Sequence, residues 1–199
     1  MKAYVVGGCV RDAIVKRPIK DIDIATPQTP ENVIKLLTAE DIKVIPTGIK
    51  HGTVTAVHGK ETIEITTLRR DLDCDGRHAE VEFTNNWQED AARRDFTMNA
   101  LSMDLDGNIY DYFNGIHDLH KGIVKFVGNP DARVQEDYLR ILRYFRFEAH
   151  YGTHAIDKES LNACIKFKQN IESLSGERIQ AEMFKLLSAR DPHSGSTFL

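Results

Sequence analysis

The pattern of apolar residues changes once along this chain of 199 residues, near Asn129-Pro130. Before that point, short β-branched runs alternate with turn residues, which is typical of a sheet with flanking helices. After it, from about Asp131 to Ala189, apolar residues recur at helical spacing and β-branched residues are fewer. We therefore predict an α+β chain, with a mixed sheet-and-helix domain over residues 1–129 and an all-helical domain over residues 130–199.

Composition narrows the class of protein. The chain is 41% hydrophobic and 28% charged, and it has neither a signal-peptide pattern nor an apolar run of membrane-spanning length. Its cysteines, Cys9, Cys74 and Cys164, are scattered and odd in number, so we expect no disulfide framework, no zinc site and a cytoplasmic location. The net charge of −4 neither indicates nor excludes a nucleic-acid partner.

Local patterns predict the individual elements of the first domain. Alternation and turn residues favour strands over 3–6, 21–26, 53–57, 62–66, 81–84, 100–104 and 109–113. Helical patterns cover 10–16, 30–37 and 87–94. Residues 68–79 are charged and contain Gly76, so we predict a mobile loop there.

Two carboxylates, Asp21 and Asp23, are separated by one residue in a predicted strand. Residues i and i+2 of a strand face the same side, about 6.5–7 Å apart at Cα. Carboxylates placed in this way can bind a pair of Mg²⁺ ions about 3.5–4 Å apart, and hard oxygen ligands favour Mg²⁺ over zinc. An edge strand with a solvated face carries the same pattern, so the pair alone leaves both interpretations open.

The glycine pair Gly7-Gly8 separates a predicted strand from a predicted helix. Without side chains, backbone N–H groups can approach phosphate oxygens at a helix N-terminus, and Arg11 lies one turn into that helix. No Gly-Lys-Ser/Thr and no third glycine follow, which excludes a Walker A loop and a dinucleotide motif. The pair therefore indicates either a phosphate site or a tight strand-to-helix turn.

A second charged segment, Arg93–Ala100, offers groups for a nucleotide. Arg94 could bind phosphate or ribose, and Asp95 and Asn99 could bind sugar hydroxyls. A charged helix end that leads into a buried strand would have the same composition. The spacing does not decide which arginine faces a ligand.

A third segment, Glu136–Arg146, predicts one continuous helix. Asp137, Arg140, Arg143 and Arg146 recur every three residues and therefore share one slowly drifting face. Three arginines behind one acid exceed what ion pairing along the helix needs. The segment is therefore a candidate binding site as well as a candidate solvated face.

Hydrogen-bond chemistry suggests what such a helix could select. An Asp accepts and an Arg donates, whereas cytosine and adenine each present an amino donor beside a ring-nitrogen acceptor. Uracil and guanine present the reverse pattern. Asp137 with Arg140 could thus accept CTP and ATP and refuse UTP and GTP, while Arg143 and Arg146 add positive potential for phosphate or RNA.

In this order, the motifs resemble those of class II tRNA nucleotidyltransferases, the CCA-adding enzymes of the polymerase-β-like superfamily. The resemblance rests on Gly7–Asp12 with Asp21 and Asp23, Arg93–Ala100, Gly122–Pro130, Glu136–Arg146 and Gly176–Ile179. It implies a polymerase-β-like nucleotidyltransferase head with a mixed sheet, followed by a helical neck. It also implies that the chain stops before the body and tail of such enzymes.

The resemblance implies template-independent addition of CCA to the tRNA 3′ end from CTP and ATP, with Mg²⁺ and release of pyrophosphate. Asp21 and Asp23 would be the catalytic metal ligands, and Glu64 is a hypothetical third carboxylate. The nucleotide would be bound by Gly8, Arg11, Arg94, Asp137, Arg140, Arg143 and Arg146. Residues 69–79 resemble the loop that helps such enzymes change from CTP to ATP, and Asp75–Glu80 resembles its mitochondrial-type version.

Other functions remain open from the sequence. Bacterial poly(A) polymerases share most of these motifs, and Asn129 stands where many CCA-adding enzymes have Asp. CC-adding-only and A-adding-only tRNA nucleotidyltransferases are further alternatives. A metal-dependent phosphohydrolase would use Asp21 and Asp23 but would leave the arginine-rich helix unexplained. A non-catalytic RNA-binding module would need no metal chemistry.

Overall fold

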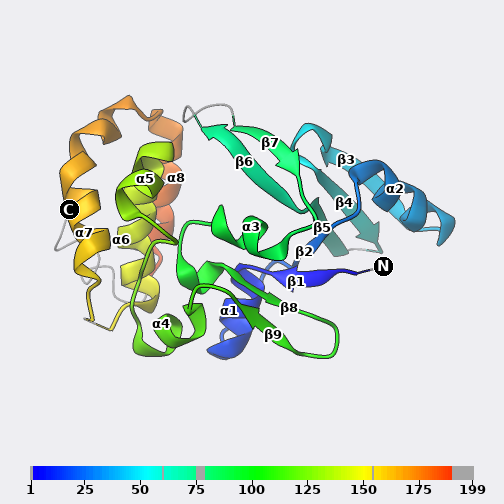
Figure 1. The fold of residues 1–199 in the computed structure, drawn as a ribbon, viewed down its shortest axis with the longest axis horizontal. Coiled ribbons are helices and arrows are strands. Elements are labelled where there is room, and N and C mark those ends of the chain that lie inside the picture. The colour runs from blue at the N-terminus through cyan, green and yellow to red at the C-terminus, as the bar shows by residue number, and fades with distance from the viewer. Residues whose placement is uncertain (1, 60, 75–78, 154, 190–199) are drawn as a thin grey trace. The chain divides into compact units, whose positions relative to one another are not determined.

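The computed structural model describes residues 2–59, 61–74, 79–153 and 155–189, which form two compact units (Figure 1). The sheet unit consists of Met1–Asp73, Ala79–Arg94 and Asn99–Tyr112. The helical unit consists of Cys74–His78, Asp95–Met98 and Phe113–Leu199. This architecture confirms the α+β prediction, whereas the domain boundary near Asn129-Pro130 stays a prediction.

The sheet unit contains a mixed sheet of seven strands in the order β3-β4-β5-β2-β1-β8-β9. β2 and β5 pair in parallel, and the other neighbours pair antiparallel. The strands are β1 (Tyr4–Val6), β2 (Asp23–Thr26), β3 (Lys43–Gly48), β4 (Thr53–His58), β5 (Glu61–Thr67), β8 (Leu101–Met103) and β9 (Ile109–Asp111). The parallel pair matters most, because it brings the beginning of β2 beside the middle of β5.

Helices α1 (Gly8–Ile14), α2 (Pro30–Ala39) and α3 (Trp87–Ala92) complete the sheet unit. α2 begins where the sequence predicts, because Thr29 accepts a hydrogen bond from the Asn32 N–H and Pro30 occupies the first turn. Its buried Val33 packs with Val54 and Ile65 of the sheet. A second apolar cluster joins Tyr4 and Leu68 to Trp87 of α3.

The predicted mobile loop over residues 68–79 is wrong for the part that the structure describes. Strands β6 (Arg69–Cys74) and β7 (Ala79–Phe83) form a separate two-stranded sheet. Arg70 pairs with Glu82 at 2.7 Å, and the Leu68 backbone anchors the strands through hydrogen bonds with Thr26 and Thr84. A two-stranded ribbon need not bury a face, so its charged composition did not exclude strands. Residues 75–78, on which the mitochondrial-type resemblance partly rests, lie outside the described residues.

Two strand predictions also need correction. β2 begins at Asp23, so Asp21 precedes the strand rather than lying within it. β3 was not predicted at all, because Lys43–Gly48 contains Pro46 and alternates poorly. β3 is the first strand in the sheet order, and an edge strand tolerates proline because one side needs no ladder hydrogen bonds.

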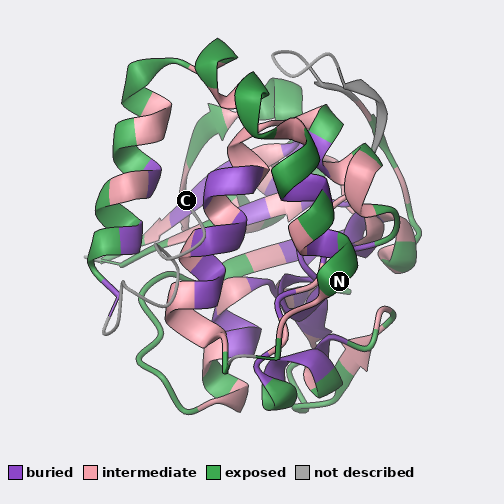
Figure 2. Cartoon of the chain, turned by 90° about the vertical axis from the view of Figure 1, so that its left-hand side faces the viewer, coloured by how far each residue is buried: buried purple, intermediate pink, exposed green. Residues whose placement is uncertain are grey.

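The helical unit consists mainly of packed helices, with α6 against α8 and α5 against α7. The helices are α4 (Gly115–Lys121), α5 (Pro130–Glu136), α6 (Leu139–Tyr151), α7 (Lys158–Phe167) and α8 (Gly176–Leu187), with a 3₁₀ turn at Lys168–Ser173. Another 3₁₀ turn covers Thr97–Asn99, whose last residue belongs to the sheet unit. Figure 2 shows that these helices carry exposed residues on one side and buried residues on the other. An aromatic core joins Phe96 and Phe126 to Tyr144 and Phe147 of α6.

The predicted continuous helix over Glu136–Arg146 is wrong at one point. α5 ends at Glu136, Asp137 has an extended backbone (φ −158°, ψ 108°), and α6 begins at Leu139. Asp137 Oδ1 accepts a hydrogen bond at 3.1 Å from the N–H of Leu139, the first residue of the new helix. Asp137 therefore does not share the helical face of Arg140, Arg143 and Arg146. In the described part of the chain, no helix is long and apolar enough to cross a membrane.

Candidate active site

The glycine turn at the start of α1 packs against an arginine. Gly7 has φ +76°, which favours glycine, and its N–H donates to the Leu101 carbonyl at 2.9 Å. A Cβ at Gly7 would lie 2.6 Å from Nη1 of Arg94. The missing side chain thus lets the Arg94 guanidinium approach the turn closely.

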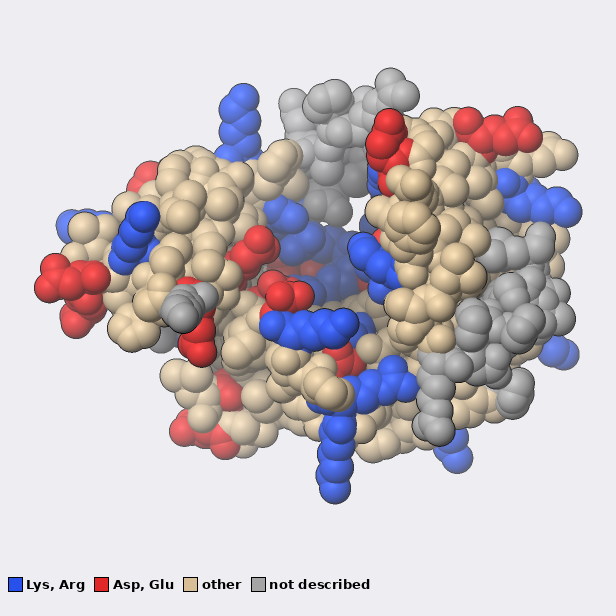
Figure 3. Space-filling view, turned by 180° about the vertical axis from the view of Figure 1, so that it is seen from behind, with Lys and Arg blue, Asp and Glu red and all other residues tan. Residues whose placement is uncertain are grey.

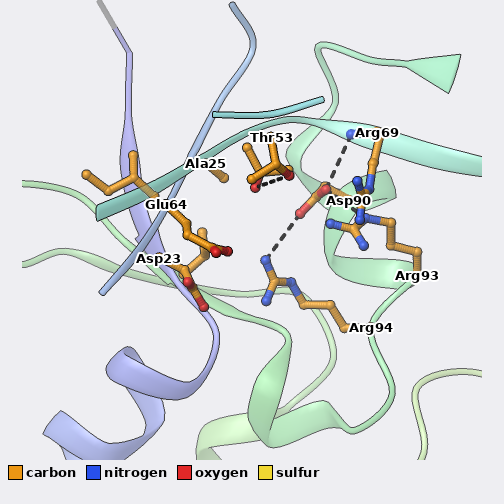
Figure 4. A pocket seen from close by; sticks show the side chains of 11 residues that line it. Asp23, Ala25, Thr53, Glu64, Arg69, Asp90, Arg93 and Arg94 are labelled. Carbon is orange, nitrogen blue, oxygen red and sulfur yellow. Dashed lines mark hydrogen bonds and ion pairs between the residues drawn. The ribbon is translucent and has the colours of Figure 1, made fainter. Parts of the chain in front are cut away.

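Two carboxylates lie side by side next to this turn. In the parallel pairing of β2 with β5, Asp23 lies opposite Glu64. Both line a cavity of about 210 Å³, and Figure 4 shows their carboxylates turned toward the guanidinium of Arg94. Within the described residues, neither side chain has a hydrogen bond or an ion pair. The hypothetical third carboxylate therefore lies beside a predicted metal ligand.

Electrostatics at Asp23 indicate crowded negative charge. Desolvation by the surrounding chain raises the pKa of Asp23 above its usual value, the Arg94 charge opposes this, and Asp21 adds to it. Asp21 is thus close enough to repel Asp23, although it lies outside the strand. A cation bound between these carboxylates would relieve the repulsion.

The opposite wall of the cavity is cationic. Arg69, Arg93 and Arg94 line it together with the buried Asp90 of α3 (Figure 4). Burial lowers the pKa of Arg94, which the charge of Asp90 only partly offsets. Three guanidinium groups around one carboxylate leave net positive charge beside Asp23 and Glu64, which suits an anion held between the two walls.

Arg11, the predicted triphosphate ligand of α1, is held by protein groups. Its Nε and Nη2 donate to Asp12 at 3.0 and 2.9 Å, and its Nη1 donates to Asn99 at 2.6 Å. Arg11 is buried, and a Cβ at Gly8 would lie 3.4 Å from its Nη2. The roles of Gly8 and Arg11 in phosphate binding stay predictions.

The available ligands fit a hard divalent cation better than zinc. Among the described residues, no three His, Cys, Asp or Glu side chains gather into a metal site. The cavity instead offers the carboxylates of Asp23 and Glu64, with Asp21 nearby. Mg²⁺ commonly binds through one or two carboxylates and takes its remaining ligands from water and substrate phosphates. The predicted Mg²⁺ therefore matches this donor set.

In the helical unit, Asp137 and Arg140 bind other partners. Asp137 accepts from Nη2 of Arg178 at 2.7 Å. Arg140 donates through Nη1 to the Arg133 carbonyl at 2.9 Å and to Glu136 at 2.5 Å. A base that formed hydrogen bonds with Asp137 and Arg140 would replace some of these contacts.

The other two arginines of α6 are also compensated. Nε of Arg143 donates to Asp95 at 2.8 Å, and Nε of Arg146 lies 2.7 Å from Glu182. Desolvation lowers the pKa of Arg146, whereas Asp95 and Glu182 outweigh desolvation at Arg143 and raise its pKa. The apparent excess of arginines in the sequence thus disappears, because the acids come from α8 and from the segment before Phe96. Asp95, which was predicted to bind sugar hydroxyls, pairs with Arg143 here.

Sequence reasoning missed several residues of the cavity. Arg69 lay in the predicted loop, and Asp90 looked like part of a polar helix. The one available signal was spacing, because Asp90 lies three and four residues before Arg93 and Arg94 on a predicted helix. Thr53 and Thr66, whose hydroxyls lie 3.1 Å apart, also line the cavity and gave no signal.

The surface charge agrees with the net charge of −4. On the face shown in Figure 3, Lys and Arg side chains are interspersed with Asp and Glu side chains, and neither sign covers the face. On this face, therefore, the charges do not form a general basic surface.

Comparisons with known proteins agree with the motifs. The family model described as poly A polymerase head domain matches residues 3–125, and the model described as probable RNA and SrmB-binding site of polymerase A matches residues 155–197. The chain is 47% identical over 188 residues to mitochondrial CCA tRNA nucleotidyltransferase 1 of Danio rerio, covering 92% of this chain and 43% of the relative. It is 45% identical over 191 residues to the CCA-adding enzyme of Oceanobacillus iheyensis, covering 95% and 46%.

Solved structures give the same result. The CCA-adding enzyme of Bacillus stearothermophilus in complex with CTP matches with a TM-score of 0.89 and 36% identity, over 100% of this chain and 47% of that one. A tRNA nucleotidyltransferase complexed with a primer tRNA and an incoming ATP analog matches with a TM-score of 0.79 and 25% identity, over 98% and 55%. The chain spans less than half the length of the curated relatives it matches.

Proposed function

The chain belongs to the class II nucleotidyltransferase family that contains the poly(A) polymerase head domain and the CCA-adding enzymes, and from this membership we propose that it adds CCA to the 3′ end of tRNA. CTP and ATP are the substrates, and pyrophosphate is released. One observation supports this proposal above the others: Asp23 and Glu64 lie in register and face Arg94 beside the glycine turn.

We propose that Asp21 and Asp23 hold Mg²⁺, with Glu64 as a further carboxylate near it. The bound metal would activate the attacking 3′ hydroxyl and stabilise charge on the phosphates. The chain itself fixes the carboxylates, because the β2–β5 register sets the positions of Asp23 and Glu64. The repulsion between Asp21 and Asp23 favours binding of a divalent cation.

The triphosphate is proposed to bind against the cationic wall. Arg94 lies against the glycine turn and faces the carboxylates, so an anion bound there meets both Arg94 and the cation held by Asp23. Gly8 permits close approach at the N-terminus of α1, and Arg11, which is paired with Asp12 at 2.9 Å, is proposed to contact the phosphates from there. Catalysis then rests mainly on positioning and charge stabilisation.

Base selection is proposed to reside in the helical unit. Asp137 and Arg140 are proposed to supply an acceptor and a donor for cytosine or adenine, and Arg143 and Arg146 to add positive charge for the nucleotide. Exchange of the contacts with Arg178 and Glu136 for contacts with a base is part of this proposal. The cytoplasmic location stays a prediction.

Single-nucleotide incorporation tests the proposed function. The chain is incubated with Mg²⁺ and tRNA that ends before CCA, with CTP alone, ATP alone or both. Addition of C from CTP alone, with A added only after C, is expected. Repeated addition from ATP alone would instead identify a poly(A) polymerase, C without A or A only on a CC end would identify a partial enzyme, and no transfer would contradict nucleotidyl transfer by this chain.

A further inference from the structure

Asp90 of α3 is buried, with 4% of its surface exposed, and it is the acid on which the cationic wall of the cavity is assembled. Arg93 Nε donates to it at 2.9 Å and Arg94 Nη2 at 3.5 Å. Within the described residues, Asp90 is the only ion-pair partner of either arginine. The position of both guanidinium groups thus depends on one carboxylate.

The two oxygens of Asp90 have different partners. Oδ1 accepts from Nε of Arg93 and, at 3.3 Å, from the backbone N–H of Arg69. Oδ2 accepts from Nη2 of Arg94. Arg69 is the first residue of β6 and itself lines the cavity. One carboxylate therefore joins the start of the β6–β7 ribbon to the arginine that faces Asp23.

Arg94 depends on this contact more than an exposed arginine would. A Cβ at Gly7 would lie 2.6 Å from its Nη1, and the Asn99 carbonyl accepts from Nη1 at 3.5 Å. Nη1 thus points to the glycine turn, while Asp90 fixes the other end of the fork at Nη2. A planar guanidinium held at both ends presents its donors in one orientation.

We propose that Asp90 is a positioning residue that holds Arg94 against the incoming triphosphate and ties it to the start of the β6–β7 ribbon. This inference rests on the proposed function, because it assumes that a nucleoside triphosphate binds in the cavity. Asp90 touches no substrate and acts through Arg94. Its removal therefore weakens recognition of the phosphate chain rather than recognition of the base.

The variant Asp90→Asn tests this proposal atom by atom. With its oxygen at the position of Oδ1, the new side chain still accepts from Arg69 and Arg93, but its amide N–H₂ meets Nη2 of Arg94, donor against donor. Glu89→Gln is the matched control on the same helix, since Glu89 accepts from Thr84 and Asn86 and not from the cavity arginines. Asp90→Glu keeps the charge and serves as the conservative variant.

The measurement is binding of CTP and of CMP by titration calorimetry with Mg²⁺, alongside thermal unfolding of each variant. Loss of one charge-assisted contact is expected to weaken CTP binding by Asp90→Asn about tenfold, with CMP binding little changed. Glu89→Gln should match the wild type, and Asp90→Glu should recover part of the loss.

The outcomes distinguish failure of the proposed function from failure of the positioning role of Asp90. If the wild-type chain does not bind CTP, the proposed function fails, and the role of Asp90 fails with it. If the wild type binds CTP and Asp90→Asn binds it equally well, only the positioning role is overturned. Equal weakening for CTP and CMP would also overturn it, because a merely structural defect affects both ligands alike.

Discussion

Acids and arginines line the cavity in the sheet unit, and acids and arginines also meet around helix α6. The two regions differ in how completely these charges form ion pairs with one another. In the cavity, Asp23 and Glu64 have no ion-pair partner within the described residues, and Arg93 and Arg94 share one acid. On α6, each arginine has an acid, supplied by Glu136, Asp95 and Glu182. Paired charges of the second kind must give up a partner before they bind a ligand, whereas charges of the first kind are available without such an exchange.

Replacing Asp23 should have the largest effect on activity. Asp23→Asn removes a proposed Mg²⁺ ligand, and since metal stabilisation is worth several kcal/mol, nucleotide transfer should fall about 10³-fold or more. The fold should not suffer, because burial and the nearby Asp21 disfavour the charged form of Asp23 and so raise its pKa. Incorporation rate and thermal unfolding are measured on the same preparation.

Asp106→Asn, in the β8–β9 turn of the same unit, makes the same chemical change away from the cavity. This control should keep full activity. If Asp23→Asn kept full activity or lost much stability, the proposed difference between the two regions would be contradicted.

Replacing Glu182 should mainly lower stability, whereas replacing Asp23 should mainly lower activity. This acid is buried and lies within ion-pair distance of Arg146, Lys185 and Arg143. Glu182→Ala leaves the partly buried Arg146 without its ion-pair partner, whereas Arg143 keeps Asp95. The change should lower the free energy of unfolding by about 3 kcal/mol in a urea titration. The exposed Glu172→Ala should change it by less than about 0.5 kcal/mol. A stable Glu182→Ala variant would show that these pairs do not support the helical unit.

Glu148 of α6 predicts how stability depends on pH. Burial raises its pKa to about 7, while Tyr144 lowers it and Asp157 raises it further. The folded state then keeps a proton that the unfolded chain has already lost, so this contribution is complete below about pH 4.3 and is lost as pH rises to about 7. Glu148→Gln should flatten that decline, with a gain at pH 8 on the order of 2 kcal/mol after allowance for solvent screening.

Unfolding free energies at pH 5 and pH 8 measure this effect. Glu159→Gln, an exposed change at the start of α7, is the control and should keep the wild-type slope. An unchanged slope in Glu148→Gln would mean that Glu148 is ionised in the fold.

The glycine turn offers the smallest and most specific change. Gly7→Ala and Gly107→Ala both place a side chain at positive φ, +76° and +85°, which costs about 1–2 kcal/mol. Only Gly7→Ala also displaces Arg94, because nothing lies within 4 Å of a Cβ at Gly107. Calorimetry should therefore show weaker CTP binding for Gly7→Ala alone, and equal binding by both variants would contradict the contact.

The sequence predicted the fold where the pattern is local. Gly7-Gly8 marked the end of β1, Pro30 marked α2, and Gly107 marked the β8–β9 hairpin. The sequence-based predictions failed where contacts between residues, rather than the local pattern, decide the structure. β6 and β7 pair with each other and expose charge, and Asp137 interrupts a helix that periodicity alone continues.

The candidate site shows the same difference between local patterns and contacts that are distant in the sequence. The closeness of Asp21 and Asp23 could be predicted because one residue separates them. Glu64 was only a hypothetical candidate, because it lies opposite Asp23 through the parallel register of β2 and β5. The acids that pair with Arg143 and Arg146 are Asp95 and Glu182, which are distant from them in the sequence. Counting charges along one helix could not reveal them.

The most direct test of the central claim is the 3′ sequence of the product. The chain is incubated with Mg²⁺, CTP and ATP on tRNA that lacks CCA, beside the Asp23→Asn variant, and the ends of the products are sequenced. The proposed function predicts that wild-type products end in CCA and stop there, while Asp23→Asn leaves the tRNA unextended. A ladder of A residues, or equal extension by Asp23→Asn, would contradict it.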